Sequence, residues 1–160
     1  MPEILIREAK IEDANLILRF ITELAIYEKA ENEVIATVED IKNALFNSDT
    51  TTKAVICTSD GEPIGFAVYF LNFSTWLGKC GLYLEDLYIA PNYRGTGAGK
   101  KLLKYLAELA VENHFGRLEW SVLDWNEPAI KFYESIGAVA QSEWVGYRLE
   151  GQSLTDFAKS

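Results

Sequence analysis

The sequence predicts an α/β domain with a central mixed β-sheet flanked by about four helices. Strand-like and helix-like segments follow the order β-α-α-β-β-β-α-β-α-β, which is typical of that class. Apolar residues recur at helical spacing in residues 14–25 and 102–110. A glycine-rich segment precedes the second of these, so residues 82–106 are expected to form a strand, a tight turn and a helix.

Composition narrows the possible functions. Residues 1–160, of which 49% are hydrophobic, are expected to form one domain with an ample core. The net charge of −9 argues against binding to nucleic acid or an anionic membrane, and it favours a small cationic partner. No apolar run approaches the length of about 18 residues that a membrane-spanning helix needs.

Two further features indicate a cytoplasmic protein without a metal site. The first ten residues, MPEILIREAK, lack the basic start and apolar core of a signal peptide. The two cysteines, Cys57 and Cys80, match no metal-ligand spacing, so no metal is predicted. Both lie in strand-like sequence and are expected to be buried thiols.

The first third of the chain contains a strand and two helices. The strand begins at Ile4, and Asp13 precedes the first helix. The apolar face of that helix consists of Ala14, Ile17, Leu18, Ile21, Leu24 and Ala25. The acidic segment 28–40 is expected to be a solvated loop or, alternatively, a mouth that attracts cations. Within it, Thr37 is expected to cap a short helix together with Asp40.

Strands and one more helix follow. Residues 53–58 and 64–73 are predicted strands joined by a hairpin turn at 59–62. Gly65 weakens the second of them unless another backbone or a ligand approaches closely. After a predicted strand at 117–123, a helix is expected from Asn126 to Ile136, ended by Gly137. Residues 139–149 are expected to supply a last strand or pair of strands.

The glycine turn at residues 94–100 has the properties of an anion site. Glycines at alternate positions remove Cβ atoms from a loop that opens a helix, whose first N–H groups lack partners and carry partial positive charge. Phosphate or pyrophosphate suits such a turn. The spacing is one residue short of a P-loop, and the third glycine comes one residue early for a dinucleotide fingerprint. An ordinary turn before a surface helix is the other interpretation.

The pattern that does fit this turn is R-x-x-G-x-G, formed by Arg94, Gly97 and Gly99. It resembles the acetyl-CoA loop of the GCN5-related N-acetyltransferase (GNAT) family. Residues 126–137, N-x-x-A-I-x-F-Y-x-x-x-G, are similar to that family's second signature. Over nearly its whole length the chain resembles the diamine (spermidine/spermine) and thialysine branches of the family, most informatively at LYLED (82–86) and DWNEPA (124–129).

This resemblance implies the GNAT acyl-CoA N-acyltransferase fold and acetyl-CoA as co-substrate, with no metal. The cofactor is expected to lie along the central strand like an added strand, paired with the backbone of Leu87, Tyr88 and Ile89. The pyrophosphate is expected at Arg94, Gly95, Thr96, Gly97, Ala98, Gly99 and Lys100. Asn126 contacts the cofactor arm or simply caps its helix, and these two interpretations are equally supported.

The implied reaction is attack of a primary amine on the thioester. An alkyl ammonium with a pKa of about 10.4 must first lose a proton, so a base near the end of the central strand is useful. Glu85 and Asp86 are neighbours on a strand, so their side chains are expected on opposite faces. The resemblance assigns Glu85 as the base, directly or through a water. Its pKa then has to be raised from about 4.3 by burial.

Asp86 and Tyr133 complete the set of residues considered for the reaction. For Asp86 a strand-end salt bridge or turn is the favoured interpretation, although it stays among the candidate substrate-binding residues. Tyr133 matches the family's usual acid, which protonates the departing CoA thiolate, and it borders the cofactor; on helix spacing alone it would be a core aromatic.

The expected acceptor is a small cationic amine, held by Tyr27, Glu28, Trp76, Glu85 and Asp86. The favoured function is acetylation of a polyamine or diamine in a ternary complex. The alternatives are a thialysine or other lysine-like amino-acid or peptide amine, and a non-catalytic acetyl-CoA-binding regulatory module. Val145 stands where the branch carries an acidic residue that contacts the far amine, and the loop at Cys80 is one residue longer; both leave the acceptor open. The resemblance also implies a homodimer.

Overall fold

The computed structural model describes residues 1–160, which form two compact units, residues 1–121 and residues 122–160. The first unit contains eight principal elements: β1 (Ile4–Glu8), α1 (Ala14–Tyr27), α2 (Val38–Leu45), β2 (Thr52–Ser59), β3 (Glu62–Ser74), β4 (Lys79–Ile89), α3 (Ala98–Glu112) and β5 (Leu118–Trp120). It also has three single-turn 3₁₀ helices, η1 (Ile11–Asp13), η2 (Glu31–Glu33) and η3 (Pro91–Tyr93). The second unit contains α4 (Glu127–Ser135) and α5 (Gly151–Lys159). No helix is long and apolar enough to cross a membrane.

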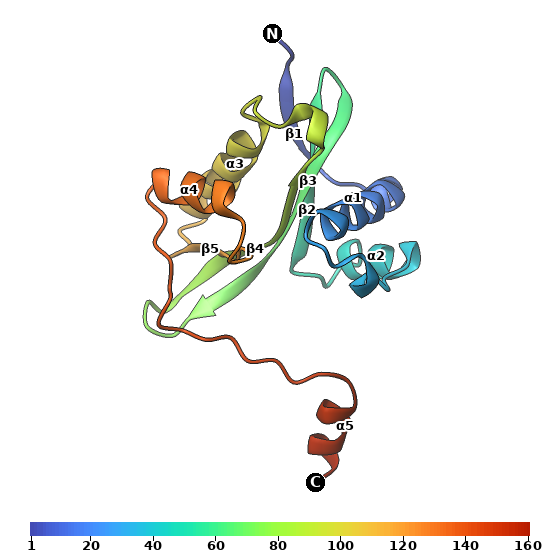
Figure 1. Cartoon of the computed structure of the whole chain (residues 1–160), viewed down its shortest axis with the longest axis vertical. Helices are drawn as coiled ribbons and strands as arrows, with labels where there is room; N and C mark the ends of the chain where they lie inside the picture. Colours follow the sequence, from blue (N-terminus) through green and yellow to red (C-terminus); the bar gives the residue numbers. More distant parts are fainter. The chain divides into compact units, whose positions relative to one another are not determined.

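The first unit is built on a five-stranded sheet in the order β1-β2-β3-β4-β5. The first three pairings are antiparallel and the β4–β5 pairing is parallel, so the predicted mixed sheet is confirmed. Figure 1 shows α1 and α2 on one side of this sheet and α3 on the other. The β4–β5 ladder covers only residues 82–84 of β4, which leaves the end of that strand without a neighbour on the β5 side.

The core beneath α1 and α2 is apolar and aromatic. Phe20 is buried and its ring lies 5.6 Å from Phe66 of β3 and 5.8 Å from Tyr88 of β4. Phe20 was not part of the predicted apolar face of α1, whereas Leu18 and Ile21 of that face are only partly buried. The helix is therefore turned slightly relative to the prediction, because its largest ring packs against the aromatic side chains of Phe66 and Tyr88.

Several local predictions are confirmed. Thr37 accepts a hydrogen bond from the Asp40 N–H at 3.1 Å, and the Asp40 carboxylate accepts one from the Thr37 N–H at 2.8 Å, which forms the capping box. The hairpin turn lies between β2 and β3, as expected. A side chain at Gly65 would collide with the carbonyl oxygen of Tyr88, which explains a glycine inside β3.

The end of the chain differs from the prediction. Residues 139–149 form no strand, and the predicted strand at 117–123 is reduced to three residues. Residues 151–159 form α5, which was not predicted. Alternating side chains describe a possible strand, but a strand also requires a partner for its backbone groups, and the second unit contains no other strand. Cys57 is buried as expected, whereas Cys80 is exposed.

Candidate active site

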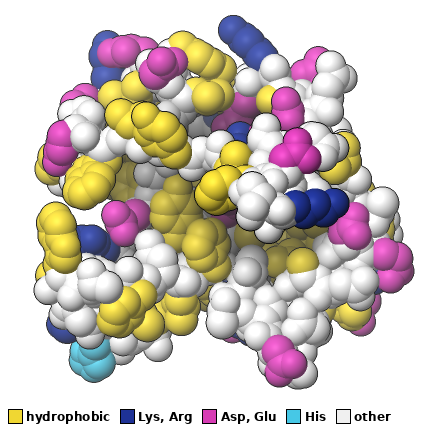
Figure 2. All heavy atoms as spheres, turned by 90° about the horizontal axis from the view of Figure 1, so that it is seen from below, with side chains coloured by type: hydrophobic (Ala, Val, Ile, Leu, Met, Phe, Trp, Pro, Cys, Tyr) yellow, Lys and Arg dark blue, Asp and Glu magenta, His cyan; other side chains and the backbone are white.

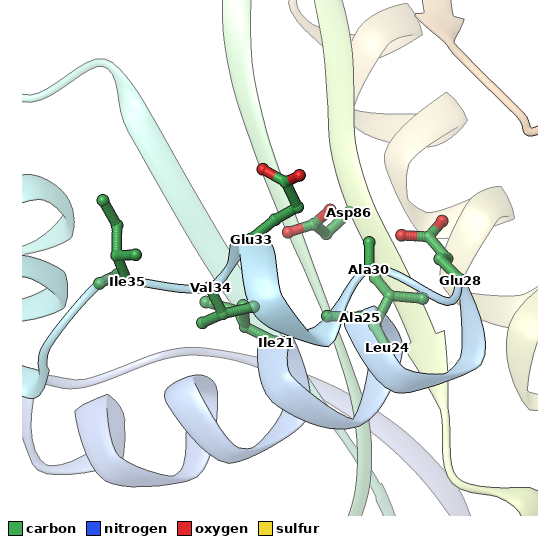
Figure 3. A pocket seen from close by; sticks show the side chains of 10 residues that line it. Ile21, Leu24, Ala25, Glu28, Ala30, Glu33, Val34, Ile35 and Asp86 are labelled. Carbon is green, nitrogen blue, oxygen red and sulfur yellow. The ribbon is translucent and has the colours of Figure 1, made fainter. Parts of the chain in front are cut away.

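A pocket of about 360 Å³ lies between the C-terminal end of α1, the following loop and β4 (Figure 3). Its wall is mainly aliphatic. Three carboxylates also line it: Glu28 follows α1, Glu33 ends η2 and Asp86 lies in β4. The lining residues are Ile21, Leu24, Ala25, Glu28, Ala30, Glu33, Val34, Ile35, Ala36 and Asp86. An apolar wall with several carboxylates suits a small cation that carries an aliphatic chain.

A β-bulge decides which acidic residue of β4 reaches this pocket. Val68 of β3 pairs with Asp86, but the next residue, Tyr69, pairs with Leu84, so Glu85 is the extra residue of the bulge. Glu85 is exposed and does not line the pocket, whereas Asp86 is partly buried in its wall. The sequence analysis had placed Glu85 towards the acceptor.

The Asp86 carboxylate has an unusual electrostatic environment. It takes part in none of the ion pairs of the structure, so the salt bridge favoured for it in the sequence analysis is not found. Burial raises the pKa of Asp86 to about 6, with further upward contributions from the negative charges of Glu85 and Glu28. Near neutral pH the group is thus ionised but readily protonated, which suits a proton acceptor.

Glu28 is placed by the way α1 ends. The N–H of Ala30 donates to the Ala25 carbonyl at 2.8 Å, and the N–H of Lys29 donates to the Ile26 carbonyl at 3.1 Å. With Lys29 in the left-handed region (φ 61°), this is a Schellman turn, in which Glu28 is the C-cap. The turn reverses the chain and leaves the Glu28 side chain at the pocket, where burial raises the pKa of its carboxyl.

Arg94 connects the glycine loop to α1. Its Nε donates to the carbonyl oxygen of Ile89 at 2.9 Å, at the end of β4. The guanidinium carbon lies 4.9 Å from the ring centroid of Tyr27 and 5.6 Å from that of Tyr88, both within the range of cation–π contacts. The Tyr88 hydroxyl in turn donates to Glu23 at 2.8 Å. The ring of Tyr27, a predicted acceptor-binding residue, therefore contacts Arg94 and does not line the pocket.

The end of β4 and the glycine loop suit an extended, phosphorylated ligand. Beyond Leu84 the β5-facing edge of β4 has no strand partner, so this edge near Leu87–Ile89 is open to an added strand, apart from the Ile89 carbonyl that accepts from Arg94. Gly95 and Gly97 have φ values of 80° and 87°, and a Cβ atom at either would meet nothing within 4 Å. Gly97 is the N-cap of α3 and supplies no capping side chain, which leaves the first N–H groups of the helix for an anion.

The remaining predicted site residues lie elsewhere. Lys100 lines a second pocket of about 470 Å³, together with Gly97, Lys101 and Lys104 of α3 and residues 4–6 of β1. Trp76 is exposed in the turn between β3 and β4. The β3 strand ends at Ser74, six positions after Val68, the partner of Asp86, so the turn that holds Trp76 begins roughly 20 Å along the strand from Asp86. Asn126 is the N-cap of α4, and Tyr133 lies within α4, so both belong to the second unit.

Sequence reasoning did not single out Glu33 as a site residue. The only signal was the acidic composition of residues 28–40, for which a cation-attracting mouth was one of two interpretations. Of the acidic residues in that segment, the structure places Glu33 as well as Glu28 at the pocket. Figure 2 shows Asp and Glu side chains over the face in view with fewer Lys and Arg, in keeping with 24 acidic and 15 basic residues.

Comparisons with known proteins agree with these features. A model of the acetyltransferase (GNAT) family matches residues 19–138. A thialysine N-epsilon-acetyltransferase of Sus scrofa is 37% identical over 169 residues, covering 99% of both chains. Spermidine/spermine N(1)-acetyltransferase-like protein 1 of Homo sapiens is 31% identical over 163 residues, which are 96% of this chain and 23% of that protein.

A solved structure gives the same assignment of fold. An integron cassette protein from the mobile metagenome of V. cholerae has a TM-score of 0.81 with 29% sequence identity, over 98% of both chains. The family match covers β2, β3, β4, the glycine loop and α4, which carry most of the predicted site residues. The chain belongs to the GNAT acetyltransferase family.

Proposed function

We propose that the protein transfers the acetyl group of acetyl-CoA to the side-chain amine of a lysine-like amino acid such as thialysine. GNAT proteins use acetyl-CoA as co-substrate, and the Sus scrofa relative, similar over nearly its whole length, is a thialysine acetyltransferase. The observation that carries the proposal is the pocket beside β4, in which an aliphatic wall is combined with carboxylates. The aliphatic wall suits the alkyl chain of an alkyl ammonium, and the carboxylates suit its positive charge.

The proposed acceptor pocket and the proposed cofactor site meet at β4. Asp86 lines the pocket, and the next three residues of β4 have the open edge that suits the pantetheine arm of the cofactor. Acetyl-CoA supplies an activated acyl carbon when it is bound there. The N–H groups of this edge and the first turn of α3 orient it, through an added-strand pairing and an anion site.

Asp86 is proposed as the group that accepts the proton from the acceptor ammonium. Its pKa of about 6 lies closer to neutral pH than that of an ordinary carboxyl, so the transfer is less unfavourable. Glu85, the base predicted from the resemblance, is the competing assignment and adjoins Asp86 in the bulge. Tyr133 is proposed as the donor of a proton to the departing thiolate, since a phenol pKa of about 10 and a thiol pKa of about 8.5 permit that transfer.

Acetylation of a polyamine or diamine is the second candidate. None of the residues that line the pocket is Lys or Arg, so the pocket itself offers no cation for the carboxylate of an amino acid. Three carboxylates favour an acceptor with more than one positive charge. The human relative similar to this chain is named as a spermidine/spermine acetyltransferase-like protein.

The test is CoA thiol release from acetyl-CoA with thialysine, lysine, putrescine, spermidine, spermine and a lysine peptide. We expect the highest kcat/KM for thialysine. A higher value for a polyamine supports the second candidate instead. Absence of turnover with every amine, while calorimetry still detects acetyl-CoA binding, contradicts both.

A further inference from the structure

The three carboxylates of the pocket are distributed along it. Glu28 follows α1, Glu33 ends η2 and Asp86 belongs to β4, and Figure 3 shows their side chains pointing into the same space from different segments. No group of three His, Cys, Asp or Glu residues in the chain is arranged to hold a metal ion. The carboxylates therefore do not converge on a point charge, and an elongated cation with separated positive centres matches them better.

The space between the carboxylates is apolar. Ile21, Leu24 and Ala25 form one side of it from α1, and Val34 and Ile35 contribute from the loop. Leu24 and Ala25 are buried, so this part of the wall is fixed by the core. Such a wall contacts methylene or thioether groups favourably and leaves the charged ends of a ligand to the carboxylates.

Backbone hydrogen bonds fix the position of Glu33. The Schellman turn at the end of α1 reverses the chain at Lys29, and the N–H of Glu33 then donates to the Ala30 carbonyl at 2.9 Å. Glu31 lies in the same 3₁₀ turn, but it is not among the residues that line the pocket. Two glutamates, two positions apart, thus share one element and differ in access to the site.

We propose that Glu33 binds a second ammonium group of the acceptor, so that the pocket selects amines with two positive charges separated by a short apolar chain. In a diamine this group is the far amine, and in a lysine-like amino acid it is the α-amine. The inference rests on the proposed function and assigns the specificity for the acceptor amine to Glu33.

The experiment compares cadaverine with hexylamine, in which a methyl group replaces the second ammonium at the same chain length. Steady-state kcat and KM are measured for wild type, Glu33→Gln and Glu31→Gln, with acetyl-CoA saturating. Both variants remove one negative charge from the same turn, so they alter the long-range field alike. Thialysine is included as the reference acceptor.

We expect wild type to prefer cadaverine over hexylamine by about tenfold in kcat/KM, through a charge-assisted contact. Glu33→Gln should raise the KM for cadaverine by about tenfold, leave its kcat near wild type and leave hexylamine unchanged. Glu31→Gln should behave as wild type with both amines.

Three results overturn the inference: equal use of cadaverine and hexylamine by wild type, equal loss for both amines in Glu33→Gln, or the same KM increase in Glu31→Gln. Acetylation of thialysine without acetylation of cadaverine also overturns it, because the charge pair then does not suffice for recognition. Wild type that acetylates neither refutes the proposed function itself, which separates the two failures.

Discussion

Asp86 lies directly opposite Val68 in the β3–β4 ladder, and this pairing leaves Glu85 as the extra residue of a bulge. Two adjacent acidic residues thereby acquire different environments. Asp86 joins the pocket and its pKa rises to about 6, while Glu85 stays exposed. The assignment of the base depends on this single register shift, and pH profiles can decide it.

Asp86→Asn should lower kcat/KM for the amine by about a hundredfold, within the range of general-base effects. In wild type, kcat/KM should rise with pH through an inflection near 6, because the base acts only when it is deprotonated. Asp86→Asn should lack this inflection and keep the later rise caused by deprotonation of the free amine. A wild-type inflection that survives in Asp86→Asn contradicts the assignment.

Glu85→Gln separates the two candidates. The negative charge of Glu85 raises the pKa of Asp86, so its removal should move the inflection to a lower pH while activity above neutral pH stays close to wild type. If Glu85 itself is the base, the same substitution abolishes the inflection and lowers kcat at all pH values. Both variants are measured with the same amine and buffer series.

Asp86→Asn should also stabilise the protein. The pKa of the folded state exceeds the ordinary value of 3.8, so ionised Asp86 disfavours folding. That penalty is absent below about pH 4, grows as the carboxyl ionises through about pH 6, and is complete above it. A shift of this size corresponds to about 3 kcal/mol, and partial contact with solvent reduces the expected gain to about 1–2 kcal/mol at pH 8.

Urea unfolding of wild type and Asp86→Asn at pH 8 and at pH 4 measures this effect. The difference in unfolding free energy should be largest at pH 8 and nearly vanish at pH 4. A variant that is less stable than wild type at pH 8 shows instead that the carboxylate makes favourable contacts. The comparison needs no substrate, so it tests the electrostatics of the pocket independently of turnover.

Local features of the chain could be predicted well. The capping box at Thr37, the hairpin turn at residues 59–62 and the glycine turn before α3 each depend on residues within a few positions of one another. Propensities and hydrogen-bonding groups suffice for such features. The sequence alone therefore predicts the glycine loop at its place between β4 and α3.

Features that depend on pairing between residues far apart in the sequence could not be predicted. Strand alternation predicts that Glu85 and Asp86 lie on opposite faces, but nothing in LYLED shows that Glu85 is the residue of β4 left out of the pairing with β3. Glu33 enters the pocket only because the chain reverses at Lys29, a non-glycine residue in a left-handed conformation. Residues 139–149 have the composition of a strand, but composition does not supply the partner that a strand requires.

Gly97→Ala should weaken acetyl-CoA binding by about tenfold, because a left-handed φ of 87° disfavours any side chain in the loop that is proposed to hold the pyrophosphate. Gly61→Ala is the matched control: Gly61 has a φ of 85°, its Cβ would also meet open space, and it lies in the β2–β3 turn. Both variants should lose about 1 kcal/mol of stability. Calorimetry should show a raised Kd only for Gly97→Ala, and equal affinities would refute the loop assignment.

Tyr133→Phe should lower kcat by more than tenfold and leave the KM for acetyl-CoA nearly unchanged, since only the proton donor to the thiolate is removed. Phe keeps the ring that packs beside Phe132, at a centroid distance of 5.8 Å, so α4 should stay folded. Tyr147→Phe, at an exposed position of the same unit, controls for loss of a phenol hydroxyl. A kcat equal to wild type in Tyr133→Phe would leave protonation of the thiolate to solvent. A fall in kcat confined to Tyr133→Phe, with near-UV circular dichroism unchanged, identifies the hydroxyl as the group that speeds departure of CoA.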